Sequence, residues 1–434
     1  MVAAGTAEPG AELVTAMSRL FAPLTLRGAT ASNRLWVAPM CQYSAEPDGP
    51  AAGVPHDWHL VHLGSRAVGG AGLVMTEAAA VSPEGRISPQ DVGLWNDLQA
   101  QAWRRTTDFV RAQGALSAVQ LAHAGRKASS RRPWEGRGVV APADAGWEPV
   151  GPSSSAYPGL ADPAALDEAG LAKVRADFVA ATGRAVTAGF DVVELHAAHD
   201  YLFHSFLSPL SNQRTDGYGG DLAGRMRLLL EVVEDVRSAW PEDRPLLLRI
   251  SASDWTPGGW SVEDSVVLAK EAAARGVDLV DCSSGGNLPA DIPLSPGYQV
   301  PFAAQVRRDA GVATGAVGLI TDPHQAEQVV ASGEADVVLM AREQLRDPYF
   351  PLRAASALGV DLPWPPQYDR AKPTTPTARG STAASLPSAP THRSDGTGAA
   401  VDHPGSGRGW LASPRWSPLR STTRPIRASR TTSA

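Results

Sequence analysis

A glycine turn leads directly into a β-branched run at Ala188-Gly-Phe-Asp-Val-Val-Glu-Leu-His196. Gly189 suits the left-handed end of a helix, and the run after it suits a buried strand. The same order recurs at Ala274-Arg-Gly-Val-Asp278 and Ser332-Gly-Glu-Ala-Asp336. The repeating unit is therefore a helix, a glycine turn and an apolar strand.

Eight apolar runs follow one another along the chain, with helix-like stretches such as residues 166–187 and 226–239 between them. The runs are Leu35–Pro39, Gly72–Glu77, Leu116–Leu121, Asp191–His196, Pro245–Ile250, Val277–Asp281, Val312–Val317 and Ala335–Met340. Such strands, joined by helices, predict a parallel sheet covered by helices. Eight units in about 340 residues predict an α/β fold of the (β/α)8 TIM-barrel type. The alternative is an open doubly wound sheet, but no G-x-G-x-x-G motif follows the first run.

Two segments depart from this repeat. Residues 122–166 are rich in Gly, Pro, Ser and Trp. On a barrel this long loop after strand 3 lies at the C-terminal face, as either a lid or a surface excursion. Residues 371–434 hold nine Lys and Arg against two Asp and Glu, without periodicity, so we predict a disordered basic tail. The predicted division is an N-terminal extension (1–19), a barrel (20–370) and the tail (371–434).

Composition limits the classes of function. Hydrophobic residues make up 43% of the 434 residues, which is enough for a large buried core. Outside the tail, 30 Lys and Arg stand against 43 Asp and Glu, so no nucleic-acid partner is predicted. The two cysteines, Cys41 and Cys282, cannot form a disulfide framework or a four-cysteine metal site. Because no 18-residue apolar run and no secretory signal is visible, we predict a cytoplasmic protein with no membrane partner.

The strongest chemical feature is His196-Ala-Ala-His199-Asp-Tyr201, at the end of the fourth run. Two imidazoles on one turn can converge on a single atom, with the phenol of Tyr201 beside them. One interpretation is zinc, but a third ligand is missing, and no metal is predicted. Another is a pair of donors that polarises a substrate carbonyl or nitro oxygen, and a third is a pair of core histidines. The position just after a barrel strand favours a functional site.

Other polar residues can bind an anionic ligand. Arg249, on a strand, is costly to bury unless an anion or polar partner meets it. It suits a delocalised anion such as reduced flavin, or a structural salt bridge with a strand carboxylate such as Glu194. Gln120 can pair with a ring edge that carries a donor and an acceptor. Phosphate candidates follow the late strands, where barrels commonly bind phosphate: Ser283-Ser-Gly-Gly286, Gly318 and Ala341-Arg342.

A series of longer motifs runs through the barrel region. In order they include Ala38-Pro-Met-Cys-Gln-Tyr43, Thr76-Glu-Ala78, Gln120-Leu-Ala-His-Ala-Gly-Arg-Lys127, His196-Ala-Ala-His199, Phe206-Leu-Ser-Pro-Leu-Ser-Asn212, Arg249-Ile-Ser-Ala252 and Arg342-Glu-Gln-Leu-Arg-Asp-Pro348. Over residues 20–370 the chain resembles the Old Yellow Enzyme family of flavin oxidoreductases. The pair Cys41 and Tyr43, with His-x-x-His, is similar to its bacterial thermophilic-like subgroup.

The resemblance implies a non-covalently bound FMN, which makes 20–370 an FMN-binding TIM barrel. The residues that match its cofactor-binding positions are Ala38, Pro39, Met40, Cys41, Ala78, Gln120, Arg249, Ala341 and Arg342, and Gly318 is added as a cofactor-binding residue from its place after a late strand. Among these, Cys41 matches a position near the reactive edge of the flavin ring. Arg249 matches a position next to the part of the ring that becomes negatively charged on reduction. The last residues, Ala341 and Arg342, match the phosphate-binding positions.

The resemblance also implies a substrate site. His196 and His199 match the residues that hydrogen-bond the activating group of the substrate. Tyr43 matches a residue that helps to bind the substrate, and Tyr201 matches the proton donor. Arg370 resembles an arginine that enters the active site of a neighbouring subunit, which implies a homodimer or homotetramer completed in trans.

Three departures from the family pattern stand out. Asp200 occupies a position that is usually Gly, where a carboxylate can alter the turn or shift the pKa values of His199 and Tyr201; a solvated loop Asp is expected. Ala341 replaces another usual Gly, so its Cβ can crowd the phosphate or oppose a positive φ. The tail continues beyond Arg370, where such chains usually end.

The resemblance implies an NAD(P)H:flavin oxidoreductase that reduces small activated alkenes, with NADPH or NADH as the reductant. The related dienoyl-CoA-reductase-like branch needs an iron–sulfur cluster that two cysteines cannot supply. The alternatives are a flavin-free phosphate-binding TIM-barrel lyase or isomerase, and a binding protein whose tail does the work.

Overall fold

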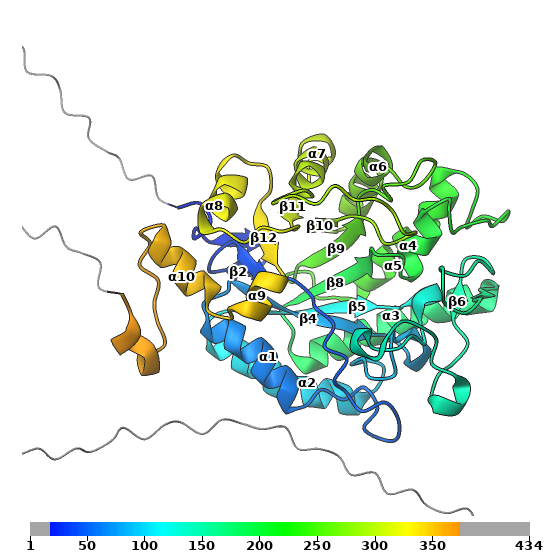
Figure 1. Ribbon diagram of the computed structural model, residues 1–434, viewed down its shortest axis with the longest axis horizontal. Helices are drawn as coiled ribbons and strands as arrows, with labels where there is room; N and C mark the ends of the chain where they lie inside the picture. The colour runs from blue at the N-terminus through cyan, green and yellow to red at the C-terminus, as the bar shows by residue number, and fades with distance from the viewer. Residues whose placement is uncertain (1–17, 374–434) are drawn as a thin grey trace, which may run out of the picture. The chain divides into compact units, whose positions relative to one another are not determined.

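Eight parallel strands close into a barrel, in the order β3, β4, β5, β8, β9, β10, β11, β12 and back to β3 (Figure 1). The computed structural model describes residues 18–373. The barrel strands are β3 (Leu35–Val37), β4 (Leu73–Ala80), β5 (Leu116–Ala122), β8 (Val192–Ala197), β9 (Leu246–Ser251), β10 (Leu279–Ser283), β11 (Ala313–Ala316) and β12 (Val337–Met340). Each of the eight predicted runs overlaps one of these strands, so the TIM-barrel prediction is confirmed.

Helices connect the strands and cover the outside of the barrel (Figure 1). They are α1 (Asp57–Val68), α2 (Asp97–Ala112), α3 (Glu168–Ala188), α5 (Leu222–Ala239), α6 (Val262–Ala274), α7 (Val300–Ala310), α8 (Pro323–Ala331) and α10 (Phe350–Ala357). Two short helices, α4 (Leu202–Leu207) and α9 (Arg342–Arg346), follow β8 and β12 and lie at the C-terminal ends of the strands.

The ends of α3 show how the sequence sets these boundaries. The Asp167 side chain caps the helix by accepting the N–H of Gly170. At the other end Gly189 takes φ +80°, in the left-handed region that ends a helix and turns the chain into β8. The helix predicted at 226–239 starts four residues earlier, at Leu222, because Asp221 caps it.

The barrel interior is apolar at its N-terminal end. Side chains from alternate positions of the strands fill it, and the buried ones from the strands are Trp36, Leu73, Met75, Ala118, Val192, Leu247, Leu279, Val337 and Leu339. The hairpin of β1 (Leu24–Leu26) and β2 (Ala29–Ala31) adds Ala31 to the same cluster. With this end filled by apolar side chains, polar groups can gather only toward the C-terminal ends of the strands.

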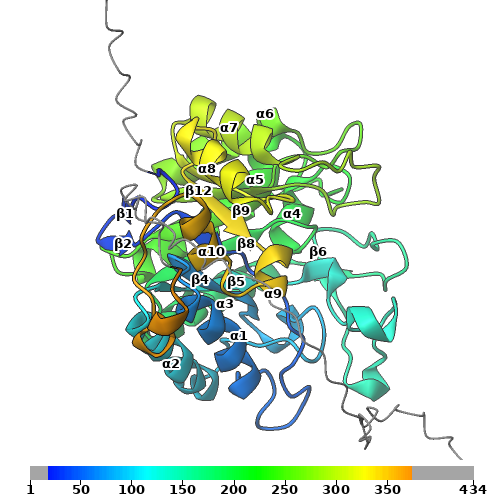
Figure 2. The same ribbon diagram turned by 60° about the vertical axis from the view of Figure 1, so that its left-hand side comes forward.

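The long loop predicted after the third barrel strand is present. It runs from β5 to α3 and contains the 3-10 turns η2 (Gly125–Lys127), η3 (Pro133–Glu135) and η4 (Pro142–Asp144), with the short pair β6 (Val150–Gly151) and β7 (Ala164–Ala165). Both views place β6 beside α4, so the loop extends over the C-terminal side of the barrel (Figure 2).

The ends of the chain fall largely outside the described residues. The predicted extension (1–19) and basic tail (371–434) are represented only by residues 18, 19 and 371–373. Ser18 and Leu20 bond to the Glu327 carboxylate of α8, which attaches the start of the described chain to the barrel. None of the helices within residues 18–373 combines the length and apolar character that a membrane crossing requires.

Candidate active site

His196 and His199 meet at the end of β8 as the sequence suggested. Their ring centroids lie 5.4 Å apart at 85°, and the Tyr201 ring lies 4.8 Å from that of His196. The His196 Nδ1 accepts the N–H of Ala198, so its Nε2 carries the proton and is free to donate. Burial, with Arg249 nearby, lowers the pKa of both imidazoles, so they are neutral donors at pH 7.

The hydroxyl groups of two serines hold His199 in place. Its Nε2 lies 2.7 Å from the Ser283 Oγ, and its backbone N–H donates to the Ser251 Oγ. Ser251 in turn donates to the carbonyl of Gly285. His199 has φ +58°, which is uncommon for a residue with a Cβ and needs such support from outside the turn.

Cys41, Tyr43 and Tyr201 pack into one small cluster around Ile87 and Ala128. Burial, with the Asp91 and Glu77 carboxyl groups nearby, raises the pKa of the Cys41 thiol well above its ordinary value. Burial also raises the pKa of the Tyr201 phenol, so Tyr201 keeps its proton at neutral pH. The structure therefore brings together residues that lie 160 positions apart in the chain.

The segment that carries Cys41 and Tyr43 is anchored by Glu77 of β4. The carboxylate Oε2 accepts the N–H of Gln42 at 2.7 Å and that of Tyr43 at 3.4 Å. Helix α1 braces the same segment, because His56 Nε2 lies 2.6 Å from the Ser44 carbonyl and Trp58 donates to Gln42. Tyr43 has φ +50°, so this clamp holds an unfavourable turn in place.

The expectation that Asp200 is a solvated loop residue is wrong. Asp200 is fully buried, and both of its carboxylate oxygens accept from the Arg126 Nε, at 3.0 and 2.8 Å. Asn287 donates to the same carboxylate at 3.1 Å. Burial raises the pKa of Asp200 to about 6, against the opposing effect of Lys127 and Arg126. The carboxylate ties the His199–Tyr201 turn to the loops after β5 and β10.

Lys127 connects the same three loops. Its Nζ donates to the carbonyls of His199 and Gly286 at 2.8 and 2.5 Å, and lies 4.1 Å from the Tyr157 ring centroid. Arg126 donates to the Ser155 carbonyl, and the Trp134 ring lies 5.9 Å from that of Tyr43. The long loop after β5 thus contacts the site, which favours the lid over a surface excursion.

Arg249 does not pair with Glu194, as the alternative prediction had it. Its Nε lies 3.2 Å from the Asp281 carboxylate of β10, whereas Glu194 accepts from Gln120 at 2.8 Å. The pairing follows from register, because Asp281 stands opposite Arg249 on the neighbouring strand. Gln120 stands opposite Ala78, so these two predicted ring contacts lie side by side.

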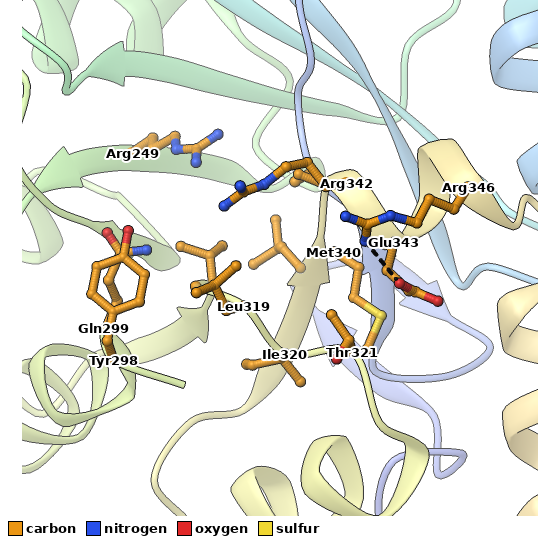
Figure 3. A pocket seen from close by; sticks show the side chains of 15 residues that line it. Arg249, Tyr298, Gln299, Leu319, Ile320, Thr321, Met340, Arg342, Glu343 and Arg346 are labelled. Atoms are coloured by element: carbon orange, nitrogen blue, oxygen red, sulfur yellow. Dashed lines mark hydrogen bonds and ion pairs between the residues drawn. The ribbon is translucent and has the colours of Figure 1, made fainter. Parts of the chain in front are cut away.

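A cavity of about 160 Å³ opens beside Arg249 (Figure 3). The guanidinium groups of Arg249 and Arg342 both face it, with Tyr298 and Gln299 across from them (Figure 3). Gly318 lines the cavity with φ +106°, and a Cβ there would lie 2.9 Å from the Gln299 Nε2. Within residues 18–373, the N–H groups of Gly318, Leu319 and Ile320 donate to no backbone or side-chain acceptor.

Two phosphate candidates behave differently from the expectation. Ala341 has φ −104°, so its Cβ opposes no left-handed conformation there. Ser283-Ser-Gly-Gly286 does not line this cavity. Ser283 contacts His199 instead, and Ser284 donates to Gln299 at 2.7 Å. A loop rich in Ser and Gly supports the histidines here, and the sequence could not distinguish this role from phosphate binding.

Pro39, Met40 and Cys41 continue from β3 and remain partly exposed, next to the buried Ala38 that lines the cavity. Arg370 lies in η5 (Pro366–Ala371), where its exposed side chain makes no hydrogen bond or ion pair with the described residues. In Figure 1 this segment lies outside the barrel, beyond α10. Among residues 18–373 no group of three or more His, Cys, Asp or Glu side chains converges as metal ligands do.

Residues 19–360 match the model of the NADH:flavin oxidoreductase / NADH oxidase family. The chain is 44% identical over 353 residues to an NADPH dehydrogenase of Halalkalibacterium halodurans, covering 81% of this chain and 98% of that protein. It is 44% identical over 354 residues to an NADPH dehydrogenase of Bacillus subtilis, covering 81% and 98%.

Two solved structures share the fold. Morphinone reductase is 29% identical with a TM-score of 0.66, covering 80% of this chain and 92% of that one. An old yellow enzyme homologue from Zymomonas mobilis is 25% identical with a TM-score of 0.65, covering 82% and 99%.

Proposed function

The chain belongs to the NADH:flavin oxidoreductase / NADH oxidase family and is an FMN oxidoreductase of the Old Yellow Enzyme type, and we propose that it acts as an ene-reductase. The proposed substrates are activated alkenes: α,β-unsaturated aldehydes and ketones, maleimides and nitroalkenes. NADPH is the proposed reductant, with NADH as the alternative, because the curated relatives are named NADPH dehydrogenases. The family membership replaces the prediction of a flavin-free lyase or isomerase.

The residues at the barrel mouth fit FMN. Two guanidinium groups face one cavity, and the N–H groups of Gly318, Leu319 and Ile320 beside it have no acceptor among the described residues. Such a donor set suits a phosphate, which Arg342 and this turn would hold. Arg249 would meet the ring, with Ala78, Gln120 and the 38–41 segment as its further contacts. When bound, FMN takes a hydride from the reductant and passes it to the alkene.

Protein groups would orient and polarise the alkene. His196 and His199 would donate to its carbonyl or nitro oxygen, since the Nε2–H of His196 is free and both rings are neutral. Tyr43 would pack against the substrate. The phenol of Tyr201 would give its proton to the carbon next to the activating group, because its raised pKa keeps it protonated until then.

Arg370 is proposed to complete the site of a neighbouring subunit in a homodimer or homotetramer. Its exposure, and its lack of partners among the described residues, support a role outside its own barrel. Mixed oligomers of Arg370→Ala and His196→Ala chains test this. Recovered activity in the mixture supports the proposal, and additive residual activities contradict it.

One observation carries the proposed function: at the mouth of a flavin-family barrel, the rings of His199 and Tyr201 lie 5.4 and 4.8 Å from that of His196, and both imidazoles are neutral. Steady-state oxidation of NADPH and NADH with 2-cyclohexenone, N-ethylmaleimide and a nitroalkene tests it. Turnover that depends on the alkene supports an ene-reductase. Oxidation that needs only oxygen, at the same rate with every alkene, contradicts it.

A further inference from the structure

A layer of buried polar side chains crosses the barrel just above its apolar filling. Gln120, Glu194, Arg249 and Asp281 project inward from β5, β8, β9 and β10, one strand period above Ala118, Val192, Leu247 and Leu279. The two carboxylates are fully buried, Gln120 is 1% exposed and Arg249 is 8% exposed. Glu194 and Asp281 thus stand on either side of β9, which carries Arg249 between them.

Hydrogen bonding in this layer is incomplete. Glu194 accepts from Gln120 through one oxygen, and its other oxygen has no partner. Neither oxygen of Asp281 accepts a hydrogen bond, although the Arg249 Nε lies 3.2 Å away as an ion-pair partner. Buried carboxylate oxygens without donors are costly, and a proton on one carboxyl group supplies a donor that the layer lacks.

Charge leads to the same requirement. Two ionised carboxylates around one guanidinium would leave a net negative charge in a medium of low dielectric constant, whereas one proton makes the trio neutral. Burial raises the pKa of both carboxyl groups, and the charge of Asp281 raises that of Glu194 further. The other titratable side chain from these strands on this side is His196, one strand period above Glu194, and it is neutral. Cys282 belongs to the cluster on the outer face of the strands.

We propose that Glu194 and Asp281 are a carboxyl pair that shares one proton and takes up a second when a negative charge is placed beside Arg249. In the proposed function that charge arises on the FMN ring, so this part of the inference rests on FMN binding at the barrel mouth. The pair would be a positioning and charge-balancing element below the ring, without contact to the substrate.

The balance of the step is simple. In the proposed function the C–H bond of the reductant would break and its hydride would give the ring one new N–H bond, two electrons and one negative charge. One proton from solvent then forms an O–H bond on the remaining carboxylate of the pair. The net charge of Arg249, the reduced ring and the Glu194/Asp281 pair is then zero. It was also zero before reduction, when the ring was neutral and the pair held one proton.

The midpoint potential of the bound flavin, measured from pH 6 to 8.5, tests the second proton. Uptake of one extra proton with two electrons changes the equilibrium constant of reduction by a further factor of ten per pH unit. The midpoint potential then falls by about 30 mV more per pH unit than it would without that proton. We expect this extra slope in the wild type and its loss in Glu194→Gln/Asp281→Asn. Equal slopes in the two proteins overturn the proposal. Asp254→Asn is the matched control, since that carboxylate is buried but one oxygen accepts from Ser208 and Trp260 and the other lies 2.9 Å from the His204 Nε2.

Infrared difference spectroscopy of the carboxylic-acid C=O stretch tests the shared proton without reference to activity. We expect a protonated-acid band in wild-type protein freed of flavin and growth of that band on reduction of the holoenzyme. In the double variant the band should be smaller and not absent, because the buried Glu77 and Asp91, whose pKa values are also raised, remain to contribute to it. A wild-type protein without that band overturns the inference even if the double variant does not fold. A band in protein that never binds FMN supports the shared proton but refutes the proposed function.

Discussion

The Arg126 Nε lies 3.0 and 2.8 Å from the two carboxylate oxygens of Asp200, in an ion pair in which neither side chain is more than 1% exposed. His199 and Asp200 both have positive φ, at 58° and 64°, so two successive residues of the turn before Tyr201 are strained. The ion pair, rather than the turn itself, sets the position of the histidines and the phenol.

Breaking this pair is therefore expected to be severe. Asp200→Ala removes the carboxylate, keeps a Cβ at positive φ and leaves Arg126 buried without its partner, which should cost about 3–5 kcal/mol of unfolding free energy. Asp200→Gly/Arg126→Leu removes both charges and relieves the turn, so it should recover part of that loss. Urea denaturation measures both, and a double variant less stable than Asp200→Ala contradicts the account.

The stability difference between wild type and Asp200→Asn should depend on pH. The pKa of Asp200 is raised from 3.8 to about 6 in the folded state, so the folded protein holds this proton where the unfolded chain has released it. Relative to the variant, the wild type should lose stability as pH rises from about 4 to 6, by up to about 1.4 kcal/mol per unit, and change little above that. Asp57→Asn, at an exposed carboxylate, is the control. A wild type that gains stability relative to Asp200→Asn over this range contradicts the expected sign.

Gly318→Ala should weaken FMN binding. The new Cβ would lie 2.9 Å from the Gln299 Nε2 and 3.1 Å from the Tyr298 ring, in the turn proposed to hold the phosphate. We expect a loss of about tenfold or more, equivalent to about 1.4 kcal/mol, in FMN titrations of flavin-free protein. Gly311→Ala is the matched control, because it has a positive φ of 71° but nothing within 4 Å of the added Cβ. Equal effects of the two substitutions would show that backbone strain alone is responsible.

Glu77→Ala should release the segment that carries Cys41 and Tyr43. Two backbone N–H groups lose their acceptor, and a buried donor left without a partner costs about 1–3 kcal/mol. Alkylation of Cys41 by iodoacetamide should then accelerate at least about tenfold, with a raised KM for the alkene. Glu263→Ala, on the exposed side of α6, should leave the alkylation rate unchanged. An unchanged rate in Glu77→Ala would mean that α1 alone holds the segment.

The barrel itself could be predicted from the sequence because its strands are largely apolar runs and helices such as α2, α3, α5 and α6 begin at their own capping side chains. The histidine pair and Tyr201 were also predictable, since they lie within six residues at the end of one strand. The partners of Arg249 and Asp200 were not. They are set by the register between β9 and β10 and by the approach of the η2 turn to the His199 loop, which no local pattern encodes.

Glu77 and Lys127 were overlooked for the same reason. Both stand inside quoted motifs, but their contacts are with backbone atoms of distant segments, at Gln42 and Gly286, and backbone acceptors and donors leave no mark on the sequence. The one available signal for Glu77 and Lys127 was a charged residue inside a motif of the predicted barrel.

Stopped-flow absorbance under anaerobic conditions tests the central claim, that the His196/His199 pair faces a reducible flavin at the barrel mouth. The purified protein should be yellow, bleach with one equivalent of NADPH and recover its colour on addition of 2-cyclohexenone. His196→Ala/His199→Ala should bleach normally but recover colour about 10²–10³-fold more slowly. Colourless protein, or recovery in the double variant at the wild-type rate, would contradict the claim.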